Sequence, residues 1–67
     1  MKRTLHAKLK EKYITAKTKD LQDFGYTTLT REHVEEQLDK LLNEESEGIT
    51  VIGKFIEHDV ENFFKNE

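Results

Sequence analysis

The sequence predicts an all-α protein, a small three-helix bundle with helices at about residues 3–24, 31–42 and 50–65. Three observations support this fold class. Apolar residues recur at the spacing of amphipathic helices, glycines divide a chain without proline into three such segments, and no two segments could pair as strands. Because the chain has only 67 residues, we expect one helical domain spanning residues 1–67.

The first segment, residues 3–24, has the pattern of a long amphipathic helix. One apolar stripe comprises Leu5, Leu9, Tyr13 and Ala16, and Ile14 and Leu21 lie on an adjoining stripe. Gly25 follows directly, at the position where a helix end favours a residue with left-handed backbone. We therefore expect this helix to end at Phe24.

The second segment, residues 31–42, has the clearest start signal. Thr30 is a good N-cap, because its hydroxyl can accept a hydrogen bond from a free backbone N–H. Leu29 before the cap and Val34 after it match a hydrophobic staple. Val34, Leu38, Leu41 and Leu42 then form a narrow apolar stripe, and the helix should end near Asn43.

The third segment, residues 50–65, begins with β-branched residues that alone would favour a strand. The longer pattern is helical, with apolar residues at Val51, Ile52, Phe55, Ile56, Val60, Phe63 and Phe64. Asp59 falls on this apolar side, where it either reaches water or bonds to Tyr13 or a lysine of the first helix. The predicted core is Leu9, Tyr13, Val34, Leu38, Leu41, Phe55, Ile56 and Phe63.

The residue types argue against a catalytic, cofactor or metal site. There is no cysteine, and no two of the histidines, His6, His33 and His58, are spaced four apart on a helix. The only serine, Ser46, lies in an acidic loop, and no glycine-rich phosphate loop is present. We therefore predict no enzyme activity and no cofactor.

Two further patterns argue against a membrane protein. No apolar run approaches the roughly 20 residues that span a bilayer. The Met-Lys-Arg start is not followed by the apolar run of a signal peptide, so we expect a cytoplasmic protein.

Charge is strongly segregated along the chain. Residues 1–20 contain seven Lys and Arg against two acids, and residues 21–67 contain four against twelve, within a net charge of −3. The two parts either attract each other within the fold or face different partners. A basic stripe of Arg3, Lys10 and Lys17 is the candidate for nucleic-acid binding. The acidic second helix opposes such binding, so nucleic acid is the disfavoured partner.

These patterns favour a small non-enzymatic regulatory or adaptor protein that binds another protein through a helical surface. Tyr26 in the turn and Phe64 near the C-terminus are candidate aromatic anchors for a partner. Alternatively, Phe64 folds back onto the core. Acids on the second helix complete the candidate partner-binding set: Tyr26, Glu32, Glu36, Asp39 and Phe64. The alternatives are nucleic-acid binding through the first helix and a homodimeric subunit. Short length, absence of cysteine and segregated charge are typical of small phage and mobile-element regulators, although no family motif is present.

Overall fold

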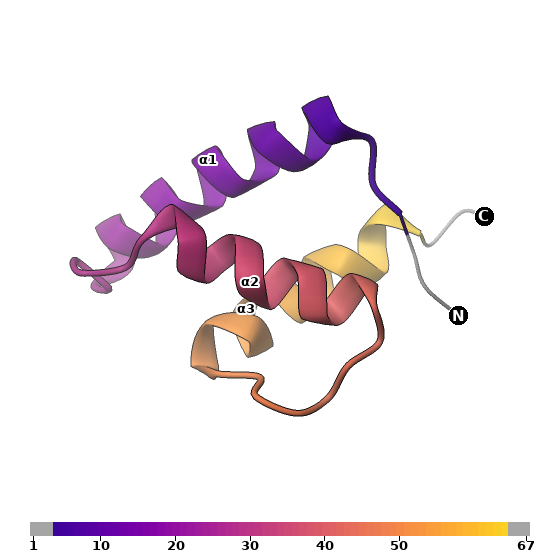
Figure 1. Cartoon of the computed structure of the whole chain (residues 1–67). Coiled ribbons are helices and arrows are strands. Elements are labelled where there is room, and N and C mark those ends of the chain that lie inside the picture. The colour runs from indigo at the N-terminus through magenta and orange to yellow at the C-terminus, as the bar shows by residue number, and fades with distance from the viewer. Residues whose placement is uncertain (1–3, 65–67) are drawn as a thin grey trace.

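A computed structural model describes residues 4–64 and contains three helices in that range: α1 (Ala7–Phe24), α2 (Arg31–Leu42) and α3 (Val51–Phe63) (Figure 1). The predicted three-helix, all-α fold is confirmed. The β-branched residues 49–52 form no strand, as predicted: the first two precede α3 and the last two begin it. The bounds of α2 match the prediction, whereas α1 begins at Ala7 rather than near Arg3. α3 begins one residue later than expected and ends at Phe63, so the prediction that it continues through Phe64 is wrong.

Local signals explain where the helices begin and end. The Thr30 hydroxyl accepts a hydrogen bond from the backbone N–H of His33 at 3.3 Å, which confirms the predicted N-cap of α2. Gly25 ends α1 with a φ of 145°, a conformation that favours glycine. The later start of α1 also has a local cause, because the His6 Nδ1 caps the helix by accepting from the N–H of Lys8. Arg3 and Lys65, the outer ends of the predicted helices, lie outside the described residues.

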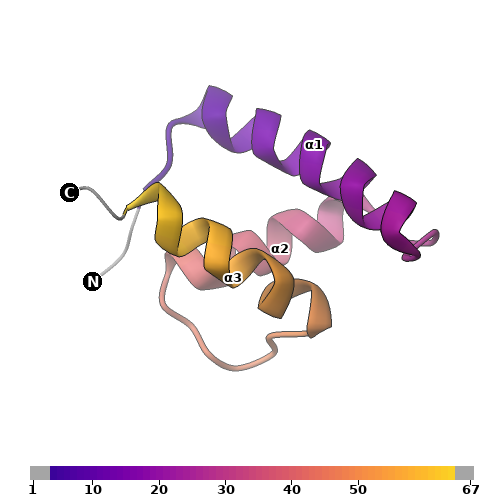
Figure 2. The ribbon, with the colours of Figure 1, turned by 180° about the vertical axis from the view of Figure 1, so that it is seen from behind.

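The helices do not simply alternate in direction along the chain. α1 and α2 are antiparallel, but residues 43–50 carry the chain back along the molecule, so α3 runs the same way as α2 (Figures 1 and 2). α1 consequently lies antiparallel to both of the other helices. The starts of α2 and α3 and the end of α1 all meet at one end of the molecule.

The hydrophobic core is built from all three helices and is mainly aliphatic. Its buried members are Ile14, Leu21, Val34, Leu38, Leu42, Ile52, Ile56 and Val60. Tyr13, Leu41 and Phe63 of the predicted core are half-buried. Leu9 and Phe55 are 45% and 40% exposed, so their assignment to the core was wrong.

The inward stripe of α1 explains the error at Leu9. The helix faces the core with Ile14, Thr18 and Leu21. The Thr18 hydroxyl donates to the Ile14 carbonyl oxygen at 2.7 Å, which satisfies the polar group and allows the residue to be buried. Because Thr18 is polar, the pattern of apolar residues does not show that Ile14, Thr18 and Leu21 form one buried stripe.

A buried glutamine joins α2 to the start of α3. Gln37 is completely buried, its Nε2 donates to the Gly48 carbonyl oxygen at 3.2 Å, and its Oε1 accepts from the Thr50 N–H at 2.9 Å. A Cβ atom added to Gly53 would lie 2.4 Å from the Gln37 Oε1. Gly53 is therefore required for the close approach of the two helices.

Candidate interaction surface

Three aromatic rings contact one another on the outside of the molecule, where α1 ends and α3 begins. The ring centroids of Phe24 and Tyr26 are 6.2 Å apart, those of Phe24 and Phe55 are 5.9 Å apart, and those of Tyr26 and Phe55 are 5.7 Å apart. Phe24 is nevertheless 73% exposed, and Val51, one turn before Phe55, is 58% exposed. We call these four residues (Phe24, Tyr26, Val51 and Phe55) the aromatic surface.

The turn after α1 assembles this surface. Phe24 is the last residue of α1, and the positive φ of Gly25 reverses the chain immediately after it. The Tyr26 N–H then donates to the Leu21 carbonyl oxygen at 3.0 Å, which places the Tyr26 ring beside that of Phe24 at an interplanar angle of 20°. Val51 and Phe55 are four residues apart, so they lie on the same side of α3.

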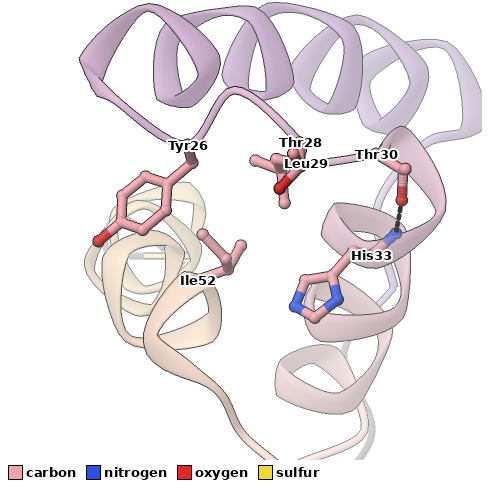
Figure 3. Close-up of a pocket in the computed structure, with 6 residues that line it drawn as sticks. All are labelled: Tyr26, Thr28, Leu29, Thr30, His33 and Ile52. Atoms are coloured by element: carbon pink, nitrogen blue, oxygen red, sulfur yellow. Dashed lines mark hydrogen bonds between the residues drawn. The ribbon is translucent and has the colours of Figure 1, made fainter.

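A small pocket of about 250 Å³ adjoins the aromatic surface. Figure 3 shows Tyr26 and Ile52 on one side of it and His33 on the other. The complete lining is Tyr26, Thr28, Leu29, Thr30, His33 and Ile52. This volume is below the roughly 300–1,000 Å³ typical of small-molecule sites. The pocket is therefore small for a separate small-molecule ligand.

The helical pattern predicts that His33 lies in solvent, opposite Val34 and Leu38, and this prediction is only partly right. The His33 side chain is half-buried, and its Nε2 lies 3.0 Å from the Thr50 Oγ1, so it links the start of α2 to the residue that precedes α3. His33 itself lines the pocket on the α2 side. No local pattern indicates the contact between His33 and Thr50, because the two residues meet only through the path of residues 43–50.

The predicted nucleic-acid stripe is largely occupied by contacts within the protein. The Lys10 Nζ bonds to the Asp39 Oδ1 at 2.5 Å, and the Lys17 Nζ lies 3.0 Å from the Asp59 Oδ2. Arg3 lies outside the described residues. The basic start of the chain and its acidic remainder therefore attract each other within the fold, which was one of the two predicted outcomes.

Asp59 forms a polar bridge between α3 and α1. Its Oδ2 accepts a hydrogen bond from the Tyr13 hydroxyl at 2.7 Å, in addition to the contact with Lys17. Partial burial acts to raise the pKa of Asp59, but the Tyr13 hydrogen bond and Lys17 outweigh it and lower the pKa below its usual value. Burial and the Asp59 carboxylate both raise the pKa of Tyr13. Of the two alternatives that the sequence left open for Asp59, the bond to Tyr13 or a first-helix lysine is present, and it is made with both partners.

The residues predicted to bind a partner do not gather on one surface. Tyr26 lies near the start of α3, whereas Phe64 follows its end, is half-buried and packs against the core. Asp39 is held by Lys10, while Glu32 and Glu36 are exposed on α2. Only Tyr26 of the predicted set belongs to the aromatic surface.

Sequence reasoning missed Phe24, Val51 and Phe55 as surface residues. The helical pattern of α3 assigns Phe55 to the core because it groups with other apolar positions. The available signal was local: Phe24 and Tyr26 flank Gly25, so a reversal of the chain there places two aromatic rings side by side outside the helix.

Within residues 4–64, no helix is long and apolar enough to cross a bilayer. The same residues contain no group of three or more His, Asp or Glu side chains arranged to hold a metal ion. Comparisons of the chain with protein-family models, curated proteins and solved structures found no match.

Proposed function

We propose that this chain is a small non-enzymatic regulatory or adaptor protein that binds another protein chain through the aromatic surface. The observation that carries the proposal is the exposure of Phe24, Val51 and Phe55 beside Tyr26, in a domain whose buried core is aliphatic. Large contiguous apolar patches on small proteins mark binding sites more often than single exposed residues do.

The composition of the surface supports a protein partner. Aromatic side chains are enriched at the centres of protein interfaces, where they bury a large area and lose little conformational entropy. The rings of Phe24, Tyr26 and Phe55 already contact one another, so binding would not have to order them separately. The adjoining pocket could receive one further apolar side chain from the partner.

The nucleic-acid alternative has weaker support. Phosphate binding needs cations that are free to meet the backbone, but Lys10 and Lys17 point to Asp39 and Asp59. The exposed acids of α2 would repel a nucleic acid that approached that helix. We therefore place the binding surface at the aromatic residues rather than on the basic side of α1.

Site-specific photo-crosslinking tests this function. A photoreactive phenylalanine analogue replaces Phe24 in the full chain, which is then irradiated in an extract of the organism that encodes it. The matched control carries the analogue at Leu9, which is also exposed on α1 but lies outside the aromatic surface. We expect polypeptide adducts from position 24 and few from position 9. Equal adduct yields, or none at position 24, would contradict the proposal.

A further inference from the structure

The aromatic surface has acidic residues at one edge and a basic residue at the other, so two copies of it could pair with opposite charges in contact. On α1, Asp20 lies one turn before Phe24 and Asp23 directly precedes it. On α3, Lys54 lies between Val51 and Phe55 in the chain. All three side chains are exposed. The surface therefore has an acidic edge on α1, an apolar centre, and a basic edge on α3.

None of these three charges takes part in an ion pair within residues 4–64. In the described residues, the ion pairs join Lys10 to Asp39, Lys17 to Asp59, Arg31 to Glu11 and Lys40 to Glu45. Asp20, Asp23 and Lys54 take part in none of them. Glu57 lies one turn after Lys54 on α3, and both residues line one surface hollow with His58 and Glu61, but no ion pair joins Lys54 to these acids.

The same charges are also unfavourable for the helices that carry them. A helix N-terminus favours negative charge and a C-terminus favours positive charge. Asp23 is in the last turn of α1, which has no basic residue, and Lys54 is in the first turn of α3, which has no acidic residue. The helix dipoles therefore do not explain why these charges lie at the two edges.

We propose that the aromatic surface binds a second copy of this chain, related by a two-fold axis through the surface, so that the acidic edge of each copy meets Lys54 of the other. This inference rests on the proposed function and names its partner. A two-fold interface pairs a surface with itself. If α1 met α1, Asp20 and Asp23 would face the same acids, whereas α1 against α3 of the second copy produces two sets of attractive pairs. Charge thus selects one orientation of the dimer.

Sedimentation equilibrium of the purified full chain, from micromolar to millimolar concentration, measures the association. We expect a reversible monomer–dimer equilibrium. Phe24→Ala should raise the dimer dissociation constant about tenfold or more, since an interface anchor is lost from both copies. Because Phe24 is mostly exposed, circular dichroism should show an unchanged fold. Lys12→Glu, a charge reversal at an exposed position of α1 twelve residues before Phe24, is the matched control and should leave the equilibrium almost unchanged.

Charge reversal tests the orientation. Asp23→Lys and Lys54→Glu should each weaken the dimer, and the double variant should recover most of the wild-type affinity. Each single reversal should change the melting temperature of the dilute monomer little, because a better interaction with the helix dipole is offset by a new like-charge neighbour, Lys19 on α1 or Glu57 on α3. If these charges only stabilised the monomer, the single reversals would lower its melting temperature and leave the dimer dissociation constant unchanged.

Several results would overturn the inference. A monomer at every concentration excludes the second copy, as does a dimer that Phe24→Ala leaves unaffected. A double variant no tighter than the single reversals excludes the pairing of α1 with α3. If the chain is monomeric while position 24 still crosslinks to a different polypeptide, this inference fails and the proposed function stands. If position 24 also forms no adduct, both fail.

Discussion

Replacement of Gln37 by leucine tests how the start of α3 is held against α2. The Gln37 side chain is completely buried and makes two hydrogen bonds, to the Gly48 carbonyl and from the Thr50 N–H. A leucine of similar volume removes both bonds and leaves two backbone groups without their partner. A hydrogen bond contributes about 0.5–1.5 kcal/mol net, and a buried polar group left unsatisfied costs about 1–3 kcal/mol. Since leucine recovers part of this by burying apolar surface, we expect a loss of about 2–4 kcal/mol.

The loss should be large relative to the total stability. A domain of this size is expected near the lower end of the usual ~5–15 kcal/mol range. At about 4–8 °C per kcal/mol for small domains, the melting temperature should fall by at least about 10 °C. Urea and thermal unfolding followed by circular dichroism measure both quantities.

Gln22→Leu is the matched control for this experiment. The Gln22 Nε2 donates one hydrogen bond, to the Leu29 carbonyl at 2.8 Å, and the residue is only half-buried. Its replacement should cost about 1 kcal/mol. A Gln37→Leu variant that is no less stable than Gln22→Leu would refute the reasoning, because the two bonds of a completely buried side chain would then contribute nothing beyond the one bond of a half-buried side chain.

Three further predictions concern packing and pH. Gly53→Ala should destabilise the fold by about 1–3 kcal/mol despite the better helix propensity of alanine, because the added Cβ would lie 2.4 Å from the Gln37 Oε1; a neutral result in urea unfolding would contradict the close approach. Leu38→Ala should cost about 2–5 kcal/mol and Leu9→Ala less than about 1 kcal/mol, since Leu38 is fully buried and Leu9 is 45% exposed; equal costs would place Leu9 in the core. The lowered pKa of Asp59 means that its ionised form stabilises the fold above about pH 4 and that this contribution is lost as the pH falls through the folded-state pKa. The stability difference between wild type and Asp59→Asn should therefore shrink in acid, and a difference independent of pH would exclude an ionised Asp59 as its cause.

The helices could be predicted closely because their signals are local. The Thr30 cap and Gly25 act on neighbouring backbone groups, and both lie where the sequence placed them. The start of α1 could not be predicted as well. A histidine side chain that accepts from the N–H two residues later is a less common cap than Ser, Thr, Asp or Asn.

The core was harder to predict because burial is decided by contacts between helices. Thr18 and Gln37 are buried polar residues whose hydrogen bonds are satisfied, one within α1 and the other by residues 48–50. Nothing in their residue types indicates burial. Conversely, Phe55 has the residue type of a core position but lies at the side of α3, where it meets Phe24 rather than the aliphatic core.

The segregation of charge along the chain and the aromatic surface are connected through the placement of α1. The pairs of Lys10 with Asp39 and of Lys17 with Asp59 join this basic helix to α2 and α3. Partly exposed ion pairs contribute about 0–1 kcal/mol each, so the buried stripe of α1 supplies most of the packing energy. The directional contacts instead select one position of α1 along the other helices, and in that position its last residue, Phe24, reaches Phe55. The basic residues of α1 therefore contribute to the aromatic surface indirectly: their ion pairs align α1, and α1 ends at Phe24.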